Sequence, residues 1–314
     1  MGKKIILNYD EINRVSLEDA IRRFLRDCKL RNLSPHTLTY YQEDLDYFKK
    51  YCPVKFIDQV NQDVYEEFIV SELDKGKKVT SLNSRIRGLR VFFKFCAERE
   101  YMVGFKIKLL KENKEIKEPY TDAELARLLA RPHTTTWTDW RMWAAVNYMM
   151  ATGNRVSTIL NIKIGDVDFT ANTIHLRTTK NRRQQIIPLS KSLKSVLKDY
   201  LRTWEYNIDD YLFPSQDGGQ LSRSSFQQGL SHYNKLRGVT KTSAHLFRHT
   251  FAKNFILAGG GIIQLQALLG HSTMDMTRHY VNIYGADLQK NYDALNPLDT
   301  FNRRKREQIK MKNS

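Results

Sequence analysis

The stretch SAHLFRHTFAKNF, Ser243–Phe255, is the most informative part of this sequence. We interpret it as a helix. Residues three apart on a helix lie on the same face, so His245 and Arg248 are expected to lie side by side. Taken alone, a His-x-x-Arg pair is usually a surface pair with no chemical role. Its meaning therefore depends on which other residues the chain supplies.

Three further stretches hold residues of the same kind. ATGNRVSTILNIKIGDVD (151–168) has Arg155 just after a helix-ending glycine, and TTKNRRQQIIPLS (178–190) has Lys180 in a polar turn. LLGHSTMDMTRHY (268–280) contains His271 and Tyr280. Each of these residues has an ordinary structural explanation by itself: a solvated cation, a packing histidine, or a tyrosine at a helix end.

Taken together, these residues form the ordered set Arg, Lys, His-x-x-Arg, His, Tyr, which suits phosphoryl transfer. Negative charge spreads over the equatorial oxygens of a phosphoryl group in transfer, and preorganised cations stabilise that charge. Two arginines can bind the non-bridging oxygens by paired hydrogen bonds. A lysine or histidine can protonate a leaving alkoxide, and a tyrosine can attack phosphorus and hold it covalently.

The composition favours a polyanionic partner. The 314 residues are 41% hydrophobic, enough for two domains with cores, and the net charge is +17. Nucleic acid is the commonest such partner, and an anionic membrane surface is the rival. From the sequence we expect neither a transmembrane segment nor a signal peptide. Three cysteines in the first third, Cys28, Cys52 and Cys96, resemble small core residues of a cytoplasmic protein rather than a metal site.

The N-terminal third is predicted to be helical. Ser16 with Asp19 predicts a capping box at the first helix, and Ser34 with Pro35 predicts the start of the second. A third helix is predicted within residues 81–100. Its cations are either a solvated face or a phosphate-facing surface, and both interpretations stay open: Arg85, Arg87, Arg90 and Lys94.

A lysine-rich linker is predicted to separate the two domains. We expect a helical domain over 1–105, the linker over 106–119, a second domain over 120–301 and a basic tail over 302–314. The second domain opens with a capping box formed by Thr121 and Glu124.

Later in the second domain, a β-hairpin is predicted from residues 172–179 and 184–190. Its turn also holds Arg182 and Arg183, two further candidate DNA-contacting cations. Helices are expected to resume near Leu193. The fold class is therefore mainly α with a small β-sheet or hairpin.

With these motifs in hand, the chain resembles the tyrosine recombinase, or phage integrase, family over nearly its whole length. The resemblance rests on ATGNR, TTK, HLFRH, LLGHS and MTRHY, and on LSPHTLTYYQEDLDYF in the first domain. It implies a two-domain architecture, with a helical core-binding domain that binds DNA followed by a mixed α/β catalytic domain.

The resemblance also implies roles for individual residues. Arg155 and Arg248 would clamp the scissile phosphate, and His271 would hydrogen-bond one of its oxygens. Tyr280 would be the nucleophile, forming a 3′-phosphotyrosyl link to DNA. Such chemistry stores each broken phosphodiester as a protein ester, so it implies neither ATP, cofactor nor metal.

Two residues would move protons in the implied reaction. Lys180 would be the general acid for the departing 5′ oxygen, and His245 would assist proton transfer at the tyrosine. The sequence departs from the family at Thr158, where the family often has a carboxylate that supports the site. His249 is expected to buttress its helix, and His279 to lie at the surface.

The implied partner is double-stranded DNA, bound by a homotetramer on two sites, with an accessory DNA-bending or directionality protein as a further partner. The resemblance implies that the segment after Tyr280 packs on a neighbouring protomer, and packing on its own domain is the alternative. Integration and excision of a mobile element is the favoured function, and a Xer-type resolvase of chromosome or plasmid dimers is the alternative. A DNA-binding protein without catalysis is disfavoured, because it would need no nucleophile.

Overall fold

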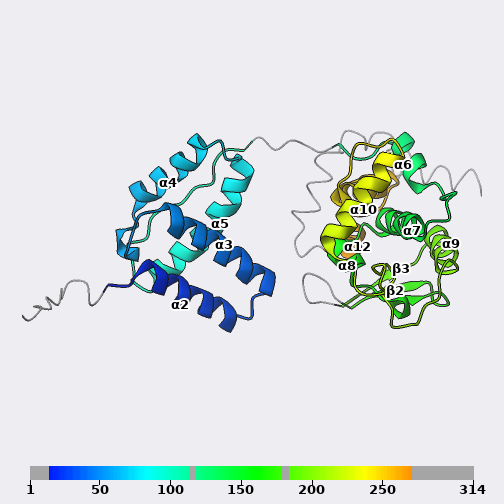
Figure 1. Ribbon diagram of the computed structural model, residues 1–314, viewed down its shortest axis with the longest axis horizontal. Coiled ribbons are helices and arrows are strands. Elements are labelled where there is room, and N and C mark those ends of the chain that lie inside the picture. Colours follow the sequence, from blue (N-terminus) through cyan, green and yellow to red (C-terminus); the bar gives the residue numbers. More distant parts are fainter. Residues whose placement is uncertain (1–13, 113–117, 178–183, 271–314) are drawn as a thin grey trace, which may run out of the picture. The chain divides into compact units, whose positions relative to one another are not determined.

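The computed structural model of the chain describes residues 14–112, 118–177 and 184–270. The chain forms two compact units, unit 1 over residues 1–115 and unit 2 over residues 116–314. Each unit has its own core of buried apolar side chains. The predicted class is confirmed, because helices dominate and the second unit carries a small antiparallel sheet (Figure 1).

The described part of unit 1 is helical. Its elements are α2 (Leu17–Leu30), α3 (Pro35–Tyr51), the 3₁₀ turn η1 (Ile57–Gln59), α4 (Gln62–Asp74) and α5 (Val79–Glu98). Aromatic rings fill the space between these helices: Phe24 of α2 lies edge-on to Phe92 and Phe95 of α5, and Phe48 of α3 lies edge-on to Phe93. Cys28, Cys52 and Cys96 are all buried, as their apolar surroundings in the sequence indicate.

The helix starts in unit 1 follow the predicted capping residues, with one correction. The Ser34 side chain accepts a hydrogen bond from the Thr37 N–H, and Pro35 is the first residue of α3. Ser16 likewise accepts from the Asp19 N–H at 3.1 Å. The carboxylate of Asp19, however, pairs with Arg22 of the same helix at 2.6 Å. It therefore does not form the second half of a capping box.

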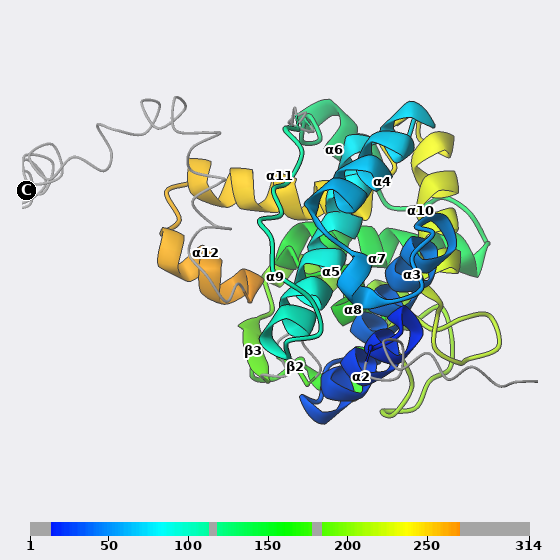
Figure 2. The ribbon, with the colours of Figure 1, turned by 90° about the vertical axis from the view of Figure 1, so that its left-hand side faces the viewer.

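Unit 2 is built around one buried helix. Its helical elements are α6 (Asp122–Leu129), α7 (Trp137–Thr152), α8 (Val156–Ile159), η2 (Ile164–Asp166), α9 (Lys191–Leu201), α10 (Arg223–Leu236), α11 (Ala244–Leu257) and α12 (Ile262–Leu269). Helix α7 packs against α6, α9, α10 and α11, and most of its residues are buried. Helices α11 and α12 are neighbours, coloured yellow and orange in Figure 2.

The sheet of unit 2 has the order β1-β2-β3, with antiparallel neighbours. Strands β2 (Thr173–Leu176) and β3 (Gln185–Pro188) confirm the predicted hairpin, and β1 (Val167–Asp168) is an addition that sequence reasoning missed. The register pairs Ile174 with Ile187, and both side chains point into the core. No helix within the described ranges is both long and apolar enough to cross a membrane.

Candidate active site

The site begins where helix α7 ends. Gly153 caps α7 in the left-handed region, with φ of 62°, and donates its N–H to the Met149 carbonyl. A Cβ built at this position would lie 2.4 Å from Phe251 Cδ1 and 2.7 Å from Leu269 Cδ2. Glycine is therefore required for two reasons, backbone conformation and space. The predicted glycine cap at this helix end is confirmed.

Arg155 follows two residues after that cap. It adopts an extended conformation, with φ of −72° and ψ of 150°, immediately before the short helix α8, and it is half-buried. Thr158 stands where the family often has a carboxylate, and it is itself buried, at 8% exposure. Its backbone N–H donates to the Arg155 carbonyl at 2.9 Å, so this turn fixes the backbone of Arg155 without an acid.

Helix α11 supplies His245 and Arg248. His245 is exposed, whereas Arg248 is only 6% exposed. The Arg248 guanidinium donates from Nη1 to the Gly153 carbonyl at 2.8 Å and from Nη2 to the Leu269 carbonyl at 2.9 Å. One side chain thereby joins α11 to the ends of α7 and α12. Because Gly153 comes two residues before Arg155, this bond also places the backbone near Arg155 beside α11.

The two hairpin strands that flank residues 178–183 are each held by a side-chain contact. On the β3 leg, the Gln185 side-chain amide donates to the carbonyls of Ala267 and Leu268, near the end of α12. On the β2 leg, Arg177 pairs with the carboxylate of Asp166, which is 3% exposed. These two contacts fix the ends of β2 and β3 on either side of residues 178–183.

Asp166 is a residue that sequence reasoning missed. Besides pairing with Arg177, its carboxylate accepts a hydrogen bond from the Lys163 N–H at 2.9 Å. It lines the same small cavity as Thr158 and His175. A buried carboxylate therefore lies near the Thr158 position, although it comes from the turn before β1. Its signal in the sequence was weak, because an aspartate in a polar turn is usually a solvated one.

The described residues contain three of the six predicted catalytic side chains. Arg155, His245 and Arg248 lie around the junction of α7, α11 and α12, and Arg248 connects all three helices. The other three, Lys180, His271 and Tyr280, lie outside the described part of the chain, as do Arg182, Arg183 and His279. In the sequence, Lys180 follows Arg177 by three positions, and His271 follows Leu269 by two.

The candidate cations on α5 divide into two kinds. Arg87, Arg90 and Lys94 are exposed. Arg90 and Lys94 line a groove between α2 and α5, together with Arg31, Arg99 and the carboxylates Asp27 and Glu98. Asp27 pairs with Arg31 and Arg99, and Glu98 lies 3.7 Å from Lys94. Cations therefore outnumber carboxylates in this groove, but most of them are paired across it.

Arg85 differs from these cations, because it faces the interior of unit 1. Its Nη1 lies 3.7 Å from Glu72 Oε2, its Nε lies 3.4 Å from Asp44 Oδ1, and its guanidinium covers the Tyr47 ring at 3.5 Å. Burial raises the pKa of Glu72, but hydrogen bonds from Lys75 and Tyr47 outweigh it and leave that pKa below its usual value. Arg85 is therefore half-buried, because two buried carboxylates hold its charge, and its contact with DNA stays a prediction.

Comparison with known proteins agrees with this architecture. Residues 118–286 match the model of the phage integrase family, and residues 21–100 match the phage integrase N-terminal SAM-like domain. The tyrosine recombinase XerC of Thermodesulfovibrio yellowstonii is 28% identical over 295 residues, which cover 88% of this chain and 96% of XerC.

Two solved structures share the fold at lower identity. The Tn1549 transposon integrase, in complex with transposon right-end DNA, is 18% identical with a TM-score of 0.70, covering 90% of this chain and 99% of that one. A lambda integrase tetramer bound to a Holliday junction is 17% identical with a TM-score of 0.66, covering 87% and 83%. The chain is thus a tyrosine recombinase, an enzyme that cleaves and rejoins DNA, and it belongs to the phage integrase family.

Proposed function

We propose that Tyr280 is the nucleophile of a site-specific strand exchange, and that Arg155 and Arg248 clamp the scissile phosphate. The observation that carries this proposal is the position of Arg248, which bonds the Gly153 and Leu269 carbonyls. This contact fixes one predicted phosphate-binding arginine next to the segment that holds the other. Paired guanidinium groups are suited to the non-bridging oxygens of a phosphate.

The chemistry proposed for the remaining residues conserves bonds and charge. The Tyr280 oxygen attacks phosphorus, its proton passes toward His245, and the bond from phosphorus to the 5′ oxygen breaks. Lys180 gives a proton to the departing 5′ oxygen, and His271 donates a hydrogen bond to a phosphate oxygen. The 3′-phosphotyrosyl ester keeps the energy of the broken bond, so the reverse attack by a 5′ hydroxyl rejoins a strand.

A nicked suicide DNA, from which the cleaved end diffuses away, tests this assignment. Wild-type protein should form a covalent adduct that maps to Tyr280 after proteolysis. Tyr280→Phe should bind DNA with unchanged affinity and form no adduct, because the substitution removes only the hydroxyl. Arg248→Ala should slow adduct formation by about 10²-fold or more. An adduct on Tyr284 or Tyr292, or an adduct formed by Tyr280→Phe, would refute the assignment.

DNA is proposed to contact both units, residues 1–105 acting as the core-binding domain and residues 120–301 as the catalytic domain, joined by a linker over 106–119. Arg87, Arg90 and Lys94 support this for unit 1, because all three side chains are exposed. Arg182 and Arg183 belong to the proposal for the second domain. Phosphate neutralisation releases counterions, so affinity should fall by about 10³-fold or more between 50 and 200 mM salt.

We favour integration and excision of a mobile element as the biological role, with a homotetramer on two DNA sites as the working assembly. Similarity in fold to a transposon integrase and to a lambda integrase tetramer supports both parts. An accessory DNA-bending or directionality protein and a cytoplasmic location complete this proposal. The location is supported by three buried, unpaired cysteines, which suit a reducing compartment.

Resolution of chromosome or plasmid dimers is the second candidate function. It is favoured by the XerC relative, which matches along almost its whole length. The two candidate functions can be distinguished by sequencing the genomic DNA fragments to which the wild-type protein becomes covalently attached. Fragments from paired element ends would support the mobile element, whereas a single chromosomal or plasmid resolution site would support the resolvase.

A further inference from the structure

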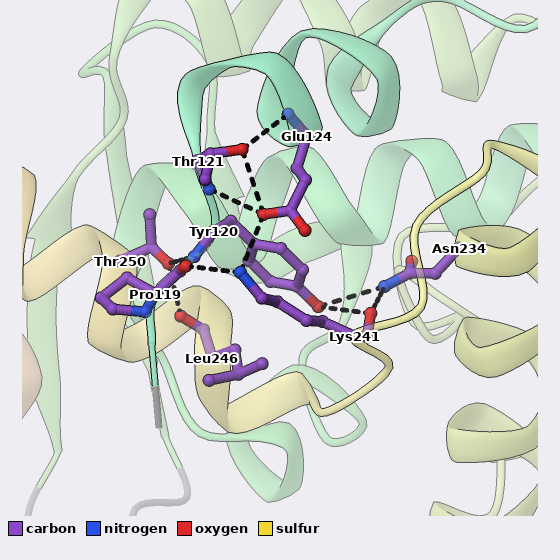
Figure 3. A network of polar contacts seen from close by, with 8 residues as sticks. All are labelled: Pro119, Tyr120, Thr121, Glu124, Asn234, Lys241, Leu246 and Thr250. Carbon is purple, nitrogen blue, oxygen red and sulfur yellow. Dashed lines mark hydrogen bonds and ion pairs between the residues drawn. The ribbon is translucent and has the colours of Figure 1, made fainter. Parts of the chain in front are cut away.

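A polar network fastens the first segment of unit 2 to helix α11 (Figure 3). The anchor segment, Pro119–Thr121, follows directly after the residues that lead in from unit 1. The Tyr120 N–H donates to the Thr250 hydroxyl at 3.0 Å, and that hydroxyl donates to the Leu246 carbonyl at 2.7 Å. Thr250 is fully buried, so these bonds have no competing water.

The rest of the network holds the anchor segment from its other side. Lys241 Nζ donates to the Pro119 carbonyl at 3.0 Å and lies 3.1 Å from Glu124 Oε2. The Tyr120 hydroxyl donates to the Lys241 carbonyl at 3.2 Å and accepts from Asn234 at 3.1 Å. The anchor segment is therefore clamped between α11 and the loop that leads into α11, as the labelled side chains in Figure 3 show.

The contacts fall on the turns of α11 that bear the proposed catalytic residues. Tyr120 places its ring 4.5 Å from that of Phe247, between His245 and Arg248 in sequence, and Thr250 comes two residues after Arg248. Arg248 itself fixes α11 to the ends of α7 and α12. The helix is thus held from two directions, by the anchor segment and by the guanidinium that is proposed to bind phosphate.

We propose that Thr250 is a positioning residue for strand cleavage: its hydroxyl fixes the anchor segment against α11, and this contact sets the placement of His245 and Arg248 at the scissile phosphate. The inference rests on the proposed function of those two residues. Reactions at phosphorus are sensitive to such placement, since a shift of about 1 Å can cost about 10²-fold in rate.

The test compares Thr250→Val with Thr250→Ser in the full-length protein. Valine keeps the shape but leaves the buried Tyr120 N–H without an acceptor, whereas serine keeps the hydroxyl. Thr250→Val should bind DNA with unchanged affinity yet form the covalent adduct about 10-fold to 100-fold more slowly in a single turnover. Thr250→Ser should recover the rate to within about 3-fold of wild type, because the bond to Tyr120 is kept.

Tyr233→Phe is the matched control for lost stability. It removes another buried hydrogen bond of unit 2, from the Tyr233 hydroxyl to the Leu128 carbonyl at 2.8 Å, outside the anchor network. It should lower Tm by an amount similar to Thr250→Val and leave the cleavage rate unchanged. Equal rate losses in Thr250→Val and Tyr233→Phe, an undiminished rate in Thr250→Val, or a failure of Thr250→Ser to recover the rate would each overturn the proposal.

Arg248→Ala, measured in parallel, separates this proposal from the one on which it rests. If Arg248→Ala cleaved at the wild-type rate, the proposed site would be wrong whatever the Thr250 variants do. If Arg248→Ala lost activity while Thr250→Val kept it, the proposed site would stand and the positioning role of Thr250 would fall.

Discussion

Gly153→Ala should destabilise unit 2 much more than the same change at another glycine with a positive φ. Gly153 has φ of 62°, and a left-handed conformation costs an alanine about 1–2 kcal/mol. The new Cβ would also lie 2.4 Å from Phe251 Cδ1 and 2.7 Å from Leu269 Cδ2. Relieving such overpacking costs about 1–3 kcal/mol, so the expected loss in free energy of unfolding is about 2–5 kcal/mol.

Gly218 is the matched control within unit 2. It has φ of 81°, but nothing lies within 4 Å of a Cβ built there. Gly218→Ala should therefore lose only the conformational part, about 1–2 kcal/mol. The difference between the two variants measures the steric part at the junction of α7, α11 and α12.

Tryptophan fluorescence during urea unfolding is a suitable assay, because all four tryptophans, Trp137, Trp140, Trp143 and Trp204, belong to unit 2. Movement of the Gly153 carbonyl would also disturb its bond from Arg248, so Gly153→Ala should cleave DNA about 10-fold or more slowly while folded. Equal destabilisation by Gly153→Ala and Gly218→Ala would refute the steric argument, and a wild-type cleavage rate would refute the functional one.

Three further predictions concern unit 1. Arg90→Gln or Lys94→Gln should each lower the magnitude of the slope of log affinity against log salt by about 0.9, as measured by fluorescence-detected DNA binding. Arg85→Gln should instead lower the free energy of unfolding of unit 1 by about 1–3 kcal/mol, as measured by hydrogen exchange. Because the folded pKa of Glu72 is lowered, its contribution to stability is present above pH ~4.5 and is lost as pH falls through the folded pKa. Hydrogen exchange of α4 amides should show this acid loss in wild type and a smaller one in Glu72→Gln.

Local patterns in the sequence predicted the parts of the fold that local physics decides. The N-caps Ser34 and Thr121, the glycine cap at Gly153 and the β2–β3 hairpin all depend on residues close together in the chain, and all are confirmed. Helix α4 was not predicted, because its buried face includes Glu72, which interrupts the apolar pattern. Strand β1 was missed because two residues are too short to show a period.

Long-range contacts could not be predicted from those patterns. Arg85 occupies a position that suits solvent on an isolated helix, and only the approach of Asp44 and Glu72 makes it an interior partner. For the site, the motifs indicated which residue types to expect and in what order. That Arg248 and Gln185 both bond to carbonyls at the end of α12 depends on the tertiary packing, which no spacing in the sequence reveals.

Arg248 also illustrates a limit set by the number of its donors. A guanidinium carries five N–H groups, and two of them already serve the Gly153 and Leu269 carbonyls, which leaves at most three for any other acceptor. A lysine at this position would have three donors on a single nitrogen, too compact to reach two carbonyls on different helices and a phosphate together. Arginine-to-lysine exchange here would therefore force a choice between holding the helices and making the proposed contact with phosphate.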